Sequence, residues 1–81
     1  MNEVKKLMGK IMSESISIKV NGELKNFSSS LSLPQLLEAL KMNPRLIAIE
    51  YNGEILHRQF WEKTQIQSGD VLEIVTIVGG G

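Results

Sequence analysis

The stretch VLEIVTIVGGG (residues 71–81) ends the chain and decides how the rest of it can be arranged. Its first eight residues are rich in β-branched side chains and predict a strand. Leu72 and Ile74 lie on one face of such a strand and predict that this face is buried. Val75 and Ile77 lie on the opposite face and are apolar as well. This pattern indicates either a central strand of a sheet or an uncovered patch for a partner.

A hairpin is predicted before this strand in the chain. Apolar and polar residues alternate over residues 16–20, and Asn21-Gly22 follows directly. Asparagine and glycine tolerate the positive φ that a tight hairpin turn requires. Residues 16–20 are therefore expected to pair with residues 23–27 as antiparallel strands.

A helix is predicted next. Ser32 and Gln35 have the spacing of a capping box, and Pro34 is tolerated in the first helical turn. Leucines then recur at i, i+3, i+4 and i+7: Leu33, Leu36, Leu37 and Leu40. The stripe lies on one side of the helix and indicates that the helix packs on a sheet.

The remaining segments complete an α+β pattern. The stretch LIAIEYNGEIL (residues 46–56) predicts a strand, a tight turn and a short return strand, and FWEK (residues 60–63) predicts a single helical turn. Further turn signals separate these elements: Asn43-Pro44, Asn52-Gly53 and Ser68-Gly69-Asp70. Periodicity alone supports only the α+β class.

Composition limits the kind of protein this is. The chain has 81 residues, 42% hydrophobic and 22% charged, which suits one small soluble domain. Nine basic and nine acidic residues are interspersed, so no basic stripe favours nucleic acid. There is no cysteine, which favours a reducing cytoplasm. No apolar run approaches the roughly 20 residues that cross a membrane.

The chain is expected to have three parts. Residues 1–14 place apolar side chains at helical spacing, but the segment is short for an isolated helix and contains Gly9. We expect a flexible extension there, a folded domain over residues 15–78, and a flexible glycine tail over residues 79–81.

Few side chains are suited to catalysis. His57 is the single histidine, and no cysteine or close pair of carboxylates accompanies it at the spacing of metal ligands. The serines at residues 28–30 have no neighbour that would activate a hydroxyl. The sequence therefore predicts neither an enzyme nor a metal site, and His57 is expected on the surface.

The glycine tail has two interpretations. Glycines at a chain end are ordinarily a floppy tail without function. Alternatively, a thread without side chains, about 10 Å long at roughly 3.3–3.6 Å per residue, can pass through a narrow channel. It would deliver the Gly81 carboxylate to a partner's active site. That partner would have to bind ATP, because this chain has no phosphate-binding loop.

Four stretches together resemble the ThiS family of sulfur carriers of thiamin biosynthesis. They are IKVNGE (residues 18–23), SLPQLLEAL (residues 32–40), AIEYNGEILHRQFW (residues 48–61) and IQSGDVLEIVTIVGGG (residues 66–81). The resemblance covers residues 15–81, although His57 stands where the family often has proline. It implies a ubiquitin-like β-grasp: a mixed sheet of four to five strands with one main helix packed across it.

The resemblance also implies a role for the C-terminus. A ThiF-type adenylyltransferase, related to ubiquitin-activating enzymes, would use ATP to adenylate Gly81, and sulfur from a cysteine desulfurase would convert it to a thiocarboxylate. A ThiG-type thiazole synthase would then take the sulfur. Gly79 and Gly80 would thread the partners' channels. The expected partner contacts are Val75, Ile77 and Val78. In this interpretation the chain is a co-substrate that binds no cofactor of its own.

Three alternatives remain at this point. The small subunit of molybdopterin synthase resembles ThiS in fold and in its Gly-Gly end, and differs in the destination of the sulfur. A ubiquitin-like modifier would instead form isopeptide bonds with lysines. In a non-covalent β-grasp adaptor the glycines would be inert.

Overall fold

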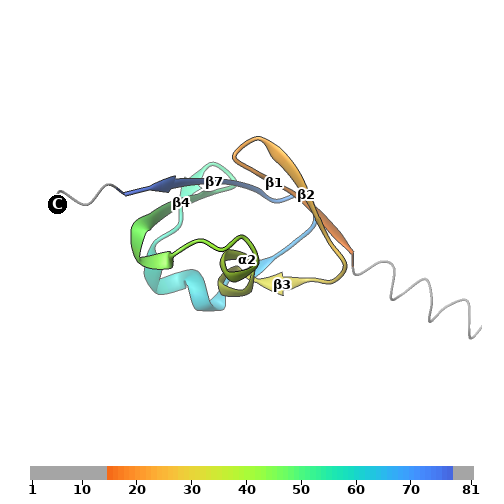
Figure 1. Cartoon of the computed structure of the whole chain (residues 1–81), viewed down its shortest axis with the longest axis horizontal. Coiled ribbons are helices and arrows are strands. Elements are labelled where there is room, and N and C mark those ends of the chain that lie inside the picture. The colour runs from red at the N-terminus through yellow and green to blue at the C-terminus, as the bar shows by residue number, and fades with distance from the viewer. Residues whose placement is uncertain (1–14, 78–81) are drawn as a thin grey trace, which may run out of the picture.

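The computed structural model describes residues 15–77 (Figure 1). Its strands are β1 (Ile16–Val20), β2 (Glu23–Phe27), β3 (Leu31–Ser32), β4 (Ile47–Tyr51), β5 (Glu54–Ile55), β6 (Gln65–Ile66) and β7 (Val71–Thr76). Its helices are the α-helix α2 (Leu33–Ala39) and the 3₁₀ helices η1 (Pro44–Leu46) and η2 (Arg58–Lys63).

Five strands form one mixed sheet in the order β2-β1-β7-β4-β5. The β1/β2, β4/β7 and β4/β5 pairs are antiparallel, whereas β1 and β7 run parallel. The last strand of the chain therefore lies between β1 and β4, at the centre of the sheet. This arrangement confirms the predicted mixed sheet, and a central position accounts for part of the apolar character of β7.

Both Asn-Gly pairs form the expected hairpin turns. Asn21 and Gly22 have φ of 53° and 84°, and Asn52 and Gly53 have φ of 51° and 89°. Positive φ at both central residues twists the turn in the sense that matches the strands. The first turn joins β1 to β2, and the second joins β4 to β5.

The capping box of α2 is present. The Ser32 hydroxyl accepts a hydrogen bond from the Gln35 N–H at 3.3 Å, and the Gln35 side-chain oxygen accepts one from the Ser32 N–H at 2.9 Å. The helix ends at Ala39, ahead of Pro44, and Lys41 follows with a φ of 59°. The capping box thus marks the start of the helix as predicted, whereas the helix ends four residues before the turn signal at Asn43.

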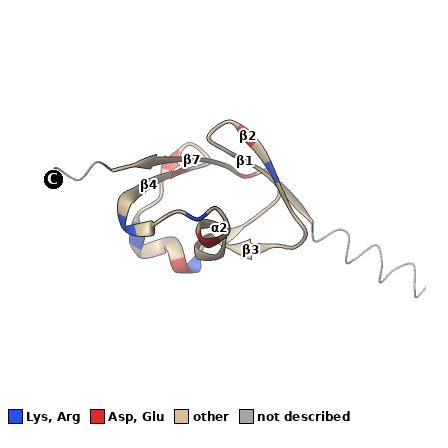
Figure 2. Cartoon of the chain, viewed as in Figure 1, with Lys and Arg blue, Asp and Glu red and all other residues tan. Residues whose placement is uncertain are grey.

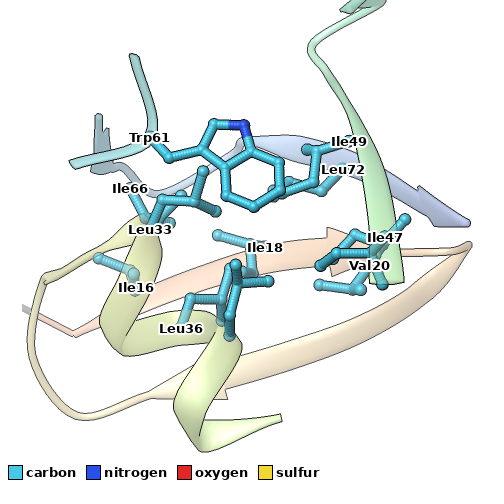
Figure 3. Close-up of a cluster of buried hydrophobic side chains, with 12 residues drawn as sticks. Ile16, Ile18, Val20, Leu33, Leu36, Ile47, Ile49, Trp61, Ile66 and Leu72 are labelled. Carbon is cyan, nitrogen blue, oxygen red and sulfur yellow. The ribbon is translucent and has the colours of Figure 1, made fainter. Parts of the chain in front are cut away.

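The core lies between α2 and one face of the sheet (Figure 3). In Figure 1, α2 and the 3₁₀ helices lie on the same side of the sheet. The buried hydrophobic residues are Ile16, Ile18, Val20, Leu33, Leu36, Leu37, Ile47, Ile49, Trp61, Ile66, Leu72 and Ile74. Leu40 is partly buried against this cluster. Three of the four leucines of the predicted stripe are thus fully in the core.

The structure differs from the sequence prediction in three places. The residues directly before α2, for which no strand was predicted, form β3, which pairs with β6 as a small second sheet. The predicted single turn over residues 60–63 is longer and begins at Arg58. The last strand ends at Thr76, where its pairing with β4 ends at Ile47.

Some predictions fall on residues beyond the described range. The flexible extension at residues 1–14, the partner contact at Val78, and the tail residues Gly79, Gly80 and Gly81 all lie outside the described residues.

Candidate partner-binding site

The central strand β7 is held by the asparagines of both hairpin turns. The Asn21 side-chain nitrogen donates to the Ile74 carbonyl at 3.1 Å, and its oxygen accepts from the Ile74 N–H at 2.7 Å. The Asn52 side-chain oxygen accepts from the Val71 N–H at 2.8 Å. We expected only turn formation from these residues, but each also hydrogen-bonds the strand that carries the C-terminus.

Asp70, the residue before β7, is buried and hydrogen-bonds three neighbouring groups. It is 9% exposed, and its carboxylate accepts hydrogen bonds from the Tyr51 hydroxyl, the Asn52 side-chain nitrogen (3.2 Å) and the Gln67 N–H (2.8 Å). Burial of Tyr51, its hydrogen bond to Asp70 and the charge of Asp70 together raise the pKa of Tyr51 to about 12. Tyr51 therefore stays a neutral donor at physiological pH.

Arg58 and Trp61 support the far end of β7. The guanidinium of Arg58 donates to the Pro44 carbonyl at 2.6 Å and the Ile47 carbonyl at 3.3 Å, and lies 4.4 Å from the centre of the Trp61 ring. These bonds hold η1 and the start of β4, where the Leu46 carbonyl accepts from the Ile77 N–H at 2.6 Å. Arg58, stacked on Trp61, thus positions Leu46, whose carbonyl bonds the first residue after β7.

The face of the sheet opposite α2 has no covering element among residues 15–77. Val75 and Ile77, two of the predicted partner contacts, are 58% and 46% exposed. Val71 on the same strand, Leu24 on β2 and Ile55 on β5 are exposed as well. Exposed apolar residues from three strands on one face of a small domain make this surface a candidate for contact with a partner. We call this surface the outer face.

Two carboxylates lie among these apolar side chains. Glu50 and Glu73 are directly opposite each other in the β4/β7 register and are both exposed. With Ile55 and Val75 they line a hollow of about 490 Å³. Within residues 15–77 the one ion pair joins Lys25 to Glu23 at 3.4 Å, so neither carboxylate is paired with a described cation. Figure 2 shows acidic and basic residues scattered over the strands, helices and loops of the described part of the chain.

The described part of the chain offers little for chemistry. No group of three or more histidine, cysteine or acidic residues there is arranged to hold a metal ion. His57 is exposed and makes no side-chain capping bond to η2. None of the helices in residues 15–77 has the length and apolar character needed to cross a membrane. The candidate site is therefore the outer face, which includes the last described residues before the C-terminal glycines.

A mixed sheet with a helix packed across one face and the last strand at its centre defines a ubiquitin-like β-grasp protein. A sequence model of the ThiS family matches residues 9–81. The chain belongs to the ThiS family.

Relatives and solved structures agree with this assignment. The protein ycf40 of Porphyra purpurea is 45% identical over 71 residues, which are 88% of this chain and all of that protein. A thiazole synthase of Paramagnetospirillum magneticum is 38% identical over 66 residues, 82% of this chain but only 20% of that protein. The crystal structure of ThiS from Geobacter metallireducens has a TM-score of 0.72 and 33% identity, covering 82% of this chain and all of that one.

Proposed function

We propose that this protein is a sulfur carrier of thiamin biosynthesis and that Gly81 carries the sulfur. The observation that supports this most directly is the position of β7. This strand is central and is held by hydrogen bonds from both hairpin turns. It ends at Thr76, and Ile77, which follows it, is exposed and lies four residues before Gly81. A rigid domain with exposed apolar residues near the end of β7, followed in the sequence by three glycines, suits delivery of a carboxylate into another protein.

The chemistry of a carboxylate explains why partners are required. Charge and resonance make a carboxylate a poor electrophile, and no described side chain activates it. In the proposed cycle an adenylating enzyme joins the Gly81 carboxylate to AMP from ATP, with pyrophosphate leaving. A sulfur donor at the oxidation level of sulfide attacks the carbonyl, AMP leaves, and a thiocarboxylate forms. The chain acts as a co-substrate in the cytoplasm, and Gly79 and Gly80 give the terminus a small cross-section.

The relatives favour thiazole synthase as the acceptor of the sulfur. The matching region is a fifth of the Paramagnetospirillum thiazole synthase, so a domain like this one forms part of the same polypeptide in that protein. Domains that work together are brought into permanent proximity by such an arrangement. This supports the thiamin pathway over molybdopterin synthesis, a ubiquitin-like modifier or an inert adaptor.

Intact-mass spectrometry tests the carrier function. The full chain is incubated with a ThiF-type adenylating enzyme, ATP and a sulfur donor, and is expected to gain the mass difference between oxygen and sulfur. A variant that lacks Gly81 should show the same thermal midpoint and no sulfur gain. Sulfur loading of that variant would contradict the role of Gly81. Attachment of the chain to lysines would show a modifier instead.

A second experiment tests the pathway. Thiazole synthase, supplied with the precursors of the thiazole ring as sulfur acceptors, is expected to bind the loaded carrier, transfer its sulfur to them and return the carrier with oxygen at the terminus, as seen by intact mass. Transfer of the sulfur to a molybdopterin synthase large subunit, with none to thiazole synthase, would overturn the thiamin assignment.

A further inference from the structure

Strand β7 is paired with β4 along its whole length, but its pairing with β1 on the other side ends before the strand does. On the side of β4, backbone bonds run to the end of the strand: the Asn52 N–H donates to the Val71 carbonyl at 2.8 Å, and the Ile77 N–H donates to the Leu46 carbonyl at 2.6 Å. In an antiparallel pair, alternate residues direct their backbone groups to opposite edges. The backbone groups of Leu72, Ile74 and Thr76 therefore face the side of β1.

Pairing on the side of β1 stops before Thr76. The Asn21 N–H donates to the Leu72 carbonyl at 2.9 Å. The Asn21 side chain then bonds both the N–H and the carbonyl of Ile74, in the place that a further residue of β1 would take. Strand β1 ends at Val20 and the chain turns back. The β1/β7 pairing covers only Lys19 with Val71 and Val20 with Leu72, and within residues 15–77 no turn or loop bond reaches the N–H or carbonyl of Thr76 from this side.

The open edge has space beside it. Thr76 is exposed, and a hollow of about 330 Å³ separates it from the loop that follows α2. Asn21, Lys41 and Asn43 line the hollow together with Thr76. An exposed strand edge with unpaired N–H and carbonyl groups is a template for another strand.

We propose that an extended segment of thiazole synthase adds to this edge of β7 as a strand when the carrier binds. The segment accepts a hydrogen bond from the Thr76 N–H and donates one to the Thr76 carbonyl, taking the place in the sheet where β1 has ended. This inference rests on the proposed function for its choice of partner. Main-chain pairing of this kind is a recurring mode of peptide recognition.

The reach of the tail supports this occupant. Gly81 lies five residues after Thr76, and five extended residues span at most about 18 Å. A partner that encloses the Gly81 carboxylate in its active site must therefore lie against the end of β7. Pairing with the open edge would fix the direction of the tail, whereas the outer face alone fixes only where the two proteins touch.

Amide hydrogen exchange tests the inference directly. In the free full-length protein the Thr76 amide is expected to exchange fast, and the Ile74 amide, which is bonded to Asn21 at 2.7 Å, slowly. With thiazole synthase in excess, exchange of the Thr76 amide should slow by about tenfold or more, as for a newly formed backbone hydrogen bond. An unchanged Thr76 amide in a complex that demonstrably forms would overturn the proposal. Protection in the free protein that grows with its concentration would also overturn it, because the edge would then pair with a second copy.

Two matched variants give an independent readout. Thr76→Pro removes the N–H without removing any described hydrogen bond within the domain, and proline is accepted at strand edges. Its affinity for thiazole synthase should fall about tenfold, while Thr76→Ala, which keeps the N–H, should bind like the wild type. Equal affinity of Thr76→Pro and Thr76→Ala would contradict the proposal. If proline lowers the thermal midpoint, the exchange experiment decides. Sulfur loading, followed by mass, tests the carrier function separately, since it can succeed whether or not Thr76 becomes protected.

Discussion

At the scale of single residues, Asp70 is the least expected feature of the fold. It is the one buried charged or polar residue in the described part of the chain, and a buried carboxylate is costly unless donors surround it. Tyr51, Asn52 and Gln67 supply those donors. The carboxylate thereby joins the end of β4, the second hairpin turn and the start of β7 at one point.

Titration of Tyr51 tests this network. The chain has a single tyrosine, so the ultraviolet absorbance of tyrosinate reports Tyr51 alone. We expect a pKa of about 12 in the folded protein, raised from 10.0 by burial and then by the hydrogen bond and charge of Asp70. In Asp70→Asn the pKa should fall part of the way back towards 10, because the negative charge is removed while burial, the largest cause of the shift, remains. A wild-type pKa near 10 would contradict the network.

The same shift predicts how stability depends on pH. The pKa of Tyr51 is higher in the folded than in the unfolded chain, so the folded state binds the proton more tightly. The stabilisation from this group is fully present below about pH 10 and is lost as the pH rises towards 12. Denaturant unfolding of the wild type should therefore show a fall in the free energy of unfolding across this window. Tyr51→Phe should lack that part of the fall.

At the scale of elements, the side chain of Asn21 extends the pairing of β1 with β7 by one step. It gives Ile74 both a donor and an acceptor, as a backbone peptide would. This places one residue in two roles: its positive φ of 53° makes the turn, and its carboxamide ends the parallel pairing. The open edge at Thr76 follows from the second role.

Substitution of Asn21 separates the two roles. Asn21→Gly keeps the positive φ but removes the carboxamide, so two backbone groups of Ile74 lose their partner. We expect a loss of about 1–3 kcal/mol in the free energy of unfolding. Asn21→Ala should cost roughly 1 kcal/mol more, because alanine is strained at positive φ. Urea unfolding of both variants measures the difference. Wild-type stability of Asn21→Gly would show that the side-chain bonds contribute nothing.

The elements also show what the sequence could and could not predict. Both Asn-Gly hairpins, the capping box at Ser32 and the leucine stripe of α2 depend on residues a few positions apart, so local patterns sufficed. Strands β3 and β6 have two residues each and pair across 35 positions from Leu31 to Ile66, which no local pattern marks.

The site was predictable to a similar degree. Apolar residues on both faces of one strand indicated either a central strand or an uncovered patch, and the structure shows that β7 is central and that Val75 and Ile77 are exposed. By contrast, the bond from Asn21 to Ile74 joins residues 53 positions apart, and the bond from Tyr51 to Asp70 joins residues 19 apart. Asparagine and aspartate are ordinary turn residues, so nothing local distinguished these from others. The open edge at Thr76 depends on where β1 ends relative to β7, which requires the sheet register.

At the scale of the whole molecule, the sheet has one face for stability and one for contact. Leu37 is 2% exposed on the α2 side, whereas Val75 is 58% exposed on the outer face. Leu37→Ala should cost about 2–5 kcal/mol by leaving a cavity. In a domain of this size, each kcal/mol lowers the thermal midpoint by about 4–8 °C. Val75→Ser should change the free energy of unfolding by no more than about 0.5 kcal/mol. Calorimetry of both variants gives the comparison, and equal losses would contradict a two-faced sheet.

The outer face should in turn govern binding. Val75→Ser removes an apolar contact close to the exit of the tail, so the affinity for thiazole synthase should fall several-fold, measured by titration calorimetry. Leu24→Ser is the matched control: Leu24 is 63% exposed on the same face, but lies on β2 at the edge of the sheet, two strands away from β7. A partner that must enclose Gly81 lies over the end of β7 first, so Leu24→Ser should bind like the wild type. If Leu24→Ser weakens binding more than Val75→Ser, the partner lies over the first hairpin and not over the end of β7. That outcome would contradict the proposed docking position.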